Sequence, residues 1–279
     1  MSSKIAEPPE KNANRLKSEA AFENARVAAR LSGAERPRAR FDFLMNRARH
    51  DYQDALSDVN EKHVAVIGCS TGGLTSLARS GAYVFGIDIS EVALFHLSQT
   101  IDKEGSNRNI KILLMNAEQP AFKRDSIDVL CCTGVLHHLD IEKTLFAWSS
   151  VLKANGRLVM MEPSAYNPLV TLYRIFTPHL RTPDEHPLRF SDIKLLEKYF
   201  DNVKIRGYAM FSLLSLALQP IPYVNKLVLP VARAAETIDS FLLKQFPWLA
   251  MFCRTIIIEA RKPKKREISC TNQSQRAET

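Results

Sequence analysis

The stretch V64-A-V-I-G-C-S-T-G-G73 joins an apolar run to a glycine-containing turn in this 279-residue chain. His63 and the apolar residues after it predict a short buried strand that ends at Ile67. Gly68 and Gly72 let the chain turn tightly into a helix, and because they lack a Cβ the backbone there can approach a ligand. The stretch therefore predicts the strand–turn–helix unit of an α/β domain. Such turns also occur for purely structural reasons, so this one alone assigns no ligand.

Strands and helices then alternate along the chain. We expect strands at residues 63–67, 83–87, 110–115, 127–132, 157–162, 203–208 and 254–260, and helices up to about residue 80 and at 90–104, 141–152 and 191–199. Continuous apolar strands joined by helices predict a parallel sheet that is covered on both faces. The predicted fold class is α/β, with a mostly parallel seven-stranded sheet, an antiparallel last strand, N-terminal helices and a helical insertion before the last strand.

An acidic residue follows the second expected strand at a distance typical of nucleoside binding. Asp88 lies 20 residues after Gly68, where a carboxylate can accept hydrogen bonds from both hydroxyls of a ribose. Asp88 or Ser90 could instead cap the next helix, but the spacing favours the ribose.

The glycine pattern argues against a nicotinamide dinucleotide. The dinucleotide motif would place glycines at 68, 70 and 73, and residue 70 is a serine. A side chain there removes the closest approach of the backbone to a pyrophosphate. The glycine pattern therefore disfavours an NAD-dependent oxidoreductase.

Five motifs in order carry a specific resemblance across about residues 60–162. They are the glycine turn, Asp88, Asn116-Ala117-Glu118, Thr133-Gly134-Val135-Leu136-His137-His138-Leu139 and Leu152-Lys153-Ala154-Asn155-Gly156. Together they resemble the class I S-adenosyl-L-methionine-dependent methyltransferases of the small-molecule type. The resemblance implies a Rossmann-like three-layer sandwich with S-adenosyl-L-methionine as cofactor. The chain departs from the family pattern at Val66, Ser70, Asn116 and Ala154-Asn155, and Val66 replaces the acid that is common in the first strand.

The resemblance also implies roles for individual cofactor-binding residues. The loop around the methionine moiety would be shaped by Gly68, Cys69, Ser70 and Gly72. Asp88 would hold the ribose, Ile89 would lie against the adenine, and Asn116 (through its amide oxygen) and Ala117 would meet the adenine edge. Thr133 and Val135 would border the sulfonium.

Residues near the transferred methyl group are candidates for catalysis and acceptor binding. His137 and His138 follow the fourth strand, and an imidazole there suits a general base; either histidine could instead only pack or hydrogen-bond the loop. We expect Glu162, Tyr166, Asp184 and His186 to contact the acceptor, because they belong to the loop that follows the fifth strand. The alternative is a polar loop whose acids satisfy turn backbones.

The acceptor class follows from composition. The apolar segment 209–250 favours a small hydrophobic or amphipathic acceptor, with oxygen as the commonest atom for this class. A nucleic-acid substrate is disfavoured because no Asn-Pro-Pro-Tyr-type motif is present. Two alternatives remain: a lipid or quinone methyltransferase with weak peripheral membrane contact, and a non-catalytic cofactor-fold protein that binds or regulates a partner. The oligomeric state is not predicted.

Charge and cysteine content suggest a protein of the cytoplasm. The net charge of +8 is spread along the chain, and its only local concentration is the run Arg261, Lys262, Lys264, Lys265 and Arg266. Five cysteines without metal-ligand spacing are best explained as buried free thiols in a reducing compartment, and no metal site is expected. Residues 207–224 carry no charge, but Pro220 and Pro222 make them a poor spanning helix.

The expected organisation is a single domain with two tails. Residues 1–18 form a disordered tail, 19–262 the methyltransferase domain and 263–279 a basic, polar tail. Within the domain we expect N-terminal helices at 19–60, the cofactor-binding core at 61–162, an active-site loop at 163–190 and an apolar cover over the active site at 209–250.

Overall fold

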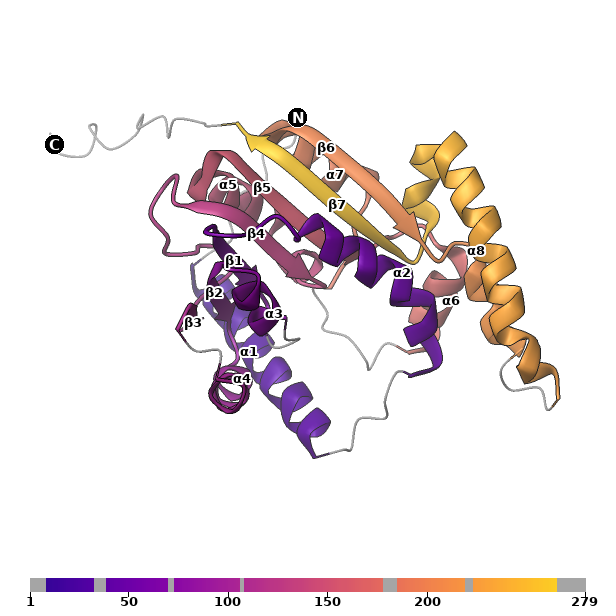
Figure 1. Cartoon of the computed structure of the whole chain (residues 1–279), viewed down its shortest axis with the longest axis horizontal. Coiled ribbons are helices and arrows are strands. Elements are labelled where there is room, and N and C mark those ends of the chain that lie inside the picture. Colours follow the sequence, from indigo (N-terminus) through magenta and orange to yellow (C-terminus); the bar gives the residue numbers. More distant parts are fainter. Residues whose placement is uncertain are drawn as a thin grey trace, which may run out of the picture.

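The computed structural model describes residues 9–32, 39–69, 73–105, 108–177, 185–218 and 223–264. Its strands are β1 (His63–Ile67), β2 (Tyr83–Asp88), β3 (Ile110–Leu114), β4 (Ile127–Thr133), β5 (Leu152–Pro163), β6 (Phe200–Tyr208) and β7 (Thr255–Pro263). They form one seven-stranded sheet in the order β3-β2-β1-β4-β5-β7-β6 (Figure 1). β1 to β5 pair in parallel, and β7 runs antiparallel to both β5 and β6. The predicted α/β fold with an antiparallel last strand is confirmed.

Helices cover both faces of the sheet. The chain forms α1 (Pro9–Leu31), α2 (Ala39–Ala55), α3 (Leu74–Arg79), α4 (Glu91–Lys103), α5 (Ile141–Val151), α6 (Pro168–Phe176), α7 (Phe190–Tyr199) and α8 (Val228–Gln245), with 3₁₀ turns η2 (Leu136–His138), η4 (Ser212–Leu218), η5 (Val224–Leu227) and η6 (Pro247–Phe252).

Alternate residues of the central strands feed two separate cores. In β1, Ala65 and Ile67 pack with Trp148 of α5 and Leu196 of α7. Val64 and Val66 point to the other face, where they pack with Leu56 near the end of α2, Leu74 of α3 and Leu94 of α4. The result is the expected three-layer sandwich. Cys69, Cys131, Cys132 and Cys253 are free and buried, as predicted.

The fifth strand begins earlier than predicted. Leu152 pairs with Ile127 and Arg157 pairs with Val129, so the register shifts between them. The Asn155-Gly156 dipeptide lies within this irregularity. Gly156 is required there, because a Cβ would meet the carbonyl oxygen of Lys153 at 2.8 Å.

The expectation of a disordered tail over residues 1–18 is wrong for residues 9–18, which begin α1. The side chain of Arg15 forms an ion pair with the buried Glu118 and donates a hydrogen bond to the carbonyl of His138 at 3.3 Å. These partners lie more than 100 residues away, so the polar composition of the segment could not reveal them. Residues 1–8 lie outside the described part of the chain.

The segment 209–250 forms the predicted helical insertion at the β6 edge of the sheet (Figure 1). Leu213 of η4 and Ala232 of α8 pack with Leu44 of α2, and Val170 of α6 joins the same cluster. Among the described residues, no helix has the length and apolar character needed to cross a membrane.

Candidate functional site

A pocket lies at the carboxyl ends of β1, β2 and β4, and α1 forms one of its walls. It is lined by Arg15, Leu16, Glu19, Glu23, Arg26, Ile67, Gly68, Ile87, Asp88, Ile89, Met115, Asn116, Ala117, Thr133, Gly134, Val135, His138 and Leu139. The structure therefore brings together most of the predicted cofactor residues. None of the described residues between 209 and 250 lines this pocket, so α1 covers it in place of the apolar segment.

The floor of the pocket depends on Gly68. Its φ of 68° lies in the left-handed region, a backbone conformation that residues other than glycine rarely adopt. A Cβ at this position would lie 2.4 Å from Cγ2 of Val135. Any larger residue at position 68 would therefore collide with the side chain of Val135, which also lines the pocket.

Asp88 ends β2 and is nearly buried at the pocket wall. Its Oδ1 accepts a hydrogen bond from the backbone N–H of Ser90 at 3.0 Å. The helix that follows is capped by Ser90, whose hydroxyl oxygen accepts from the N–H of Ala93 at 3.0 Å. Because Ser90 makes the cap, Asp88 is not needed as a cap for α4.

Two of the predicted cofactor residues have other tasks. The Oδ1 of Asn116 accepts the N–H of Glu118 at 2.9 Å, so its amide oxygen stabilises a local turn instead of being reserved for an adenine. Cys69 does not line the pocket: its side chain is fully buried in the core beside Leu74, and burial raises the pKa of its thiol. Ser70 and Gly72 lie outside the described residues.

A buried carboxylate organises the turn after β4. One oxygen of Glu162 accepts the N–H groups of Val135 and Leu136, each at 2.9 Å. The other oxygen lies 2.7 Å from Nδ1 of His137. Burial alone would raise the pKa of Glu162, but the hydrogen bond and charge of His137 and the two backbone donors together lower it. Glu162 is therefore an anion that accepts a hydrogen bond from Nδ1–H of His137, and in the neutral imidazole this leaves the lone pair on Nε2.

The surroundings of His138 disfavour its charged form. Burial, followed by the charge of His137, lowers the pKa of His138 to about 3. His138 is therefore neutral at pH 7 and a poor proton acceptor, and it lines the cofactor pocket. Of the two predicted catalytic residues, His137 has the arrangement of a base, since a carboxylate fixes its tautomer.

The structure places the acceptor-side candidates in different surroundings. Glu162 is fully buried, so it orients His137 and does not face an acceptor. The ring of Tyr166 packs against Phe190 and Phe252, with centroids 5.0 and 5.8 Å apart. The backbone N–H of His186 donates to the carbonyl of His137 at 3.0 Å. Asp184 lies outside the described residues.

Glu185 is a site residue that sequence reasoning missed. Its carboxylate lies 3.9 Å from Nε2 of His137 and forms an ion pair with Arg174 at 2.9 Å. Ligand atoms of His137, His138 and Glu185 all lie within 4.8 Å of one another, a spacing that could admit a metal ion. Arg174 already supplies a positive charge to this group, so the ion pair accounts for the arrangement without a metal.

Comparison with known proteins assigns this region to a family. Residues 65–160 match the family described as methyltransferase domain, and this region supplies every pocket residue that does not come from α1. The chain contains a methyltransferase domain. Relatives of the domain include the "Ubiquinone biosynthesis O-methyltransferase" of Aromatoleum aromaticum, which is 31% identical over 121 residues, or 41% of this chain and 49% of that protein. The chain spans about half the length of the curated relatives it matches.

Solved structures share the fold of the methyltransferase domain. Geranyl diphosphate C-methyltransferase from Streptomyces coelicolor A3(2) is 14% identical, with a TM-score of 0.52 over 76% of this chain and 77% of that chain. Magnesium protoporphyrin IX methyltransferase from Synechocystis PCC 6803 is 16% identical, with a TM-score of 0.54 over 70% of this chain and 95% of that chain. At these identities the likeness concerns the fold.

The α1 wall adds charged residues to the pocket of the methyltransferase domain that sequence reasoning missed. Glu19 is buried, and its carboxylate lies 4.0 Å from Nδ1 of His138. Glu23 forms an ion pair with Arg26 at 2.9 Å. The sequence gives one indication of these acids: Val66 replaces the acid that is common in the first strand, so a negative charge at this site must come from another element.

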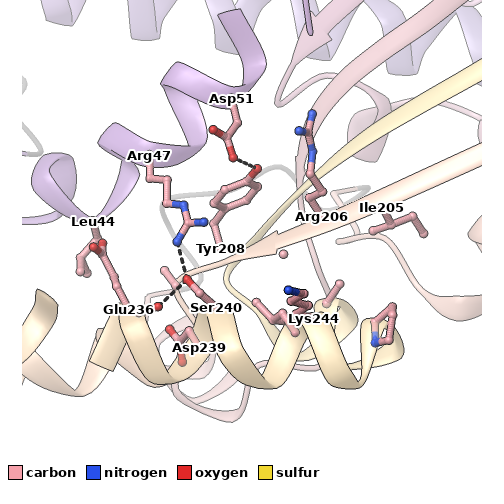
Figure 2. A pocket seen from close by; sticks show the side chains of 15 residues that line it. Leu44, Arg47, Asp51, Ile205, Arg206, Tyr208, Glu236, Asp239, Ser240 and Lys244 are labelled. Atoms are coloured by element: carbon pink, nitrogen blue, oxygen red, sulfur yellow. Dashed lines mark hydrogen bonds between the residues drawn. The ribbon is translucent and has the colours of Figure 1, made fainter. Parts of the chain in front are cut away.

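A second cavity lies outside the matched residues 65–160, between α2, β6 and α8 (Figure 2). Its polar groups are engaged with one another: the hydroxyl of Tyr208 donates to Asp51 at 2.6 Å, and Arg47 donates to Ser240. Asp239 accepts the N–H groups of Met210, Phe211 and Ser212 at 2.9–3.2 Å. These contacts hold α8 against α2 and the end of β6, so we assign the cavity a structural role.

Proposed function

We propose that this protein transfers a methyl group from S-adenosyl-L-methionine to an oxygen atom of a small amphipathic acceptor. One observation carries the proposal: a pocket with the features of a nucleoside site lies directly beside a histidine that a buried carboxylate orients. The match of residues 65–160 to the methyltransferase domain family supports the same conclusion.

The residues of the pocket fit the cofactor. Gly68 leaves room for close approach of a ligand to the backbone of the β1 turn. Asp88 stands at the strand end where a carboxylate can bind ribose hydroxyls. Ile89, Met115 and Ala117 offer apolar surface for an adenine ring. When bound, the cofactor supplies a methyl group on a sulfonium, which is already activated for displacement.

Glu19 can replace the acid that the first strand lacks. An ammonium group in a buried site needs a negative partner, and Val66 offers none. Glu19 lies on the α1 wall of the pocket, is buried there, and has its carboxylate 4.0 Å from Nδ1 of His138. We therefore assign the methionine ammonium to Glu19.

The acceptor proton is assigned to Nε2 of His137. Glu162 fixes the Nδ1 proton, so the lone pair on Nε2 is available to an acceptor hydroxyl. The carboxylate of Glu185, 3.9 Å away, stabilises the imidazolium that forms. Such a base contributes about 10²–10⁴-fold to the rate when the acceptor is a weakly acidic hydroxyl. Correct placement of the two reactants supplies roughly 7–11 kcal/mol more.

Oxygen as the acceptor atom has support from the relatives' names. Two curated relatives, 31% and 33% identical over part of their length, are each named "Ubiquinone biosynthesis O-methyltransferase". Carbon and nitrogen acceptors remain outcomes of the assay, since geranyl diphosphate C-methyltransferase has the same fold.

The first test is binding of S-adenosyl-L-methionine by calorimetry, with NADH as the control ligand. Asp88→Ala is expected to abolish binding. Ser90→Ala is its matched control, because it removes the cap of α4, lowers stability by about 1 kcal/mol and leaves the pocket carboxylate in place. Tight NADH binding, or no binding of the methyl donor, contradicts the proposal.

The second test is turnover on a panel of acceptors. Aromatic acceptors with adjacent hydroxyl groups and with or without an alkyl tail are incubated with the labelled methyl donor, and products are identified by mass spectrometry. Methyl ethers support the proposal. Donor binding without turnover on the whole panel favours a non-catalytic cofactor-fold protein.

A further inference from the structure

We propose that the outer faces of α6 and α8 form a surface that docks onto an anionic lipid bilayer. We call this surface the α6/α8 face. α6 contributes Leu169, Leu172, Tyr173 and Phe176; α8 contributes Val231, Ile238 and Phe241, together with Leu227 directly before the helix. All of these side chains are exposed. The inference concerns a surface and is tested without methyl transfer, so it stands or fails apart from the proposed function.

α8 is apolar on two sides. Val228 and Ala232 are buried against the rest of the domain. Leu227, Val231, Ile238 and Phe241 follow a spacing of four, seven and three residues, so they lie on one side of the helix. Phe241 is 63% exposed. A stripe of large apolar side chains that faces away from the core needs another partner.

α6 repeats the pattern. Its residues 169, 172, 173 and 176 share one side of the helix, and none of the α6 residues is buried. Phe176 is 74% exposed. Val170 packs into the cluster that also contains Leu213 and Ala232. The two helices therefore belong to one lobe at the edge of the molecule (Figure 1).

The charges around this surface select the partner. Neither residues 164–177 nor residues 209–235 contain an aspartate or glutamate. Lys226, Arg233 and Lys244 are exposed. The two acids of α8 are less accessible: Glu236 is half-buried, and Asp239 is buried as the cap of η4. Cations beside exposed aromatic and aliphatic groups match the head groups and acyl boundary of an anionic bilayer. Two copies of this chain would instead bring cations against cations.

The surface also lies close to the reaction centre. Arg174 on α6 forms an ion pair with Glu185, whose carboxylate is 3.9 Å from Nε2 of His137. β5 and β6 both run antiparallel to β7, so β5 leads into α6 and β6 leads into η4 at the same end of the strands. An amphipathic molecule in the bilayer would therefore meet the protein next to His137.

The experiment is flotation of the full chain with vesicles of phosphatidylcholine, with and without phosphatidylglycerol. We expect binding to the vesicles that contain phosphatidylglycerol, weakened by salt. Phe176→Ser/Phe241→Ser is expected to weaken it by about tenfold or more. The matched control is Phe95→Ser, because Phe95 is 62% exposed on α4, away from this surface. Equal binding of the wild type and the double variant overturns the proposal, as does absence of wild-type binding.

Two further measurements keep the proposal open to refutation. Sedimentation velocity is expected to give the same mass for the wild type and the double variant; a dimer that dissociates in the variant assigns the surface to a second copy and overturns the proposal. Should circular dichroism show the double variant unfolded, Lys226→Glu/Arg233→Glu replaces it, since both side chains are exposed. Unchanged binding of this variant to anionic vesicles overturns the proposal as well.

Discussion

Nδ1 of His137 lies 2.7 Å from Oε2 of Glu162, and the other oxygen of this carboxylate holds the backbone of the same turn. One buried anion therefore sets both the path of the chain after β4 and the tautomer of the histidine. This arrangement separates two roles that the sequence left together: Glu162 orients the imidazole, and we propose that His137 takes the acceptor proton.

Glu162→Gln tests this separation. The amide oxygen can still accept the N–H groups of Val135 and Leu136, but the amide nitrogen then faces Nδ1 of His137 and forces the proton onto Nε2. We expect the kcat for a hydroxyl acceptor to fall by about 10²–10⁴-fold, the contribution of a general base, while the Kd of S-adenosyl-L-methionine changes little. Steady-state kinetics and calorimetry check the two parts. Loss of donor binding with unchanged kcat would show that the carboxylate serves the cofactor pocket instead.

The low pKa of His138 predicts how stability depends on pH. Because burial and the charge of His137 hold the folded pKa near 3, the unfolded chain binds a proton below about pH 6.5 while the folded protein does not. The contribution of His138 is thus fully present above pH 6.5. It is lost as the pH falls toward 3, by about 1.4 kcal/mol per pH unit. His138→Asn removes the titrating group, so urea unfolding between pH 6.5 and 4 should be less steep in the variant. Parallel pH profiles would mean that His138 titrates alike in both states.

Most of the strands and pocket residues could be predicted from local sequence patterns. The turn at Gly68, the acid at the end of β2 and the apolar strands each depend on residues a few positions apart, and such features are visible in one dimension. Seven strands and the grouping of Asp88, Ile89, Thr133 and Val135 in one pocket followed from them.

Long-range ion pairs account for what the sequence could not show. Arg15 stabilises α1 against Glu118, 103 residues away, and no local signal distinguishes that arginine from others in a polar segment. Glu162 was expected to face the acceptor because it begins the loop that follows the fifth strand, but its carboxylate is buried under the turn it supports. A strand-end acid can point along the chain or into the fold, and packing alone decides which.

Glu19→Gln tests the assignment of the methionine ammonium. A charge-assisted hydrogen bond to a buried group contributes about 1.5–3 kcal/mol, so the Kd of S-adenosyl-L-methionine should rise by roughly 10- to 100-fold. Adenosine, which lacks the methionine, provides the matched ligand: its affinity should be unchanged in Glu19→Gln and lost in Asp88→Ala. If Glu19→Gln weakens both ligands alike, the residue acts through the position of α1.

Gly68→Ala separates backbone strain from loss of space. At Gly68 the φ of 68° and the 2.4 Å approach of a Cβ to Val135 act together, whereas Gly105 has a similar φ of 64° with nothing within 4 Å. Each alanine should lower the free energy of unfolding by about 1–2 kcal/mol through the left-handed backbone, with a further loss at position 68.

Calorimetry then distinguishes the two positions. Gly105→Ala should bind S-adenosyl-L-methionine like the wild type, and Gly68→Ala should bind it poorly, because the methyl group displaces Val135 at the pocket. Gly68→Ala/Val135→Ala relieves the contact and should recover part of the stability, since the alanine Cβ no longer meets Cγ2. Full donor binding by Gly68→Ala would mean that the cofactor does not approach the β1 turn, and the pocket would have to be assigned to another ligand.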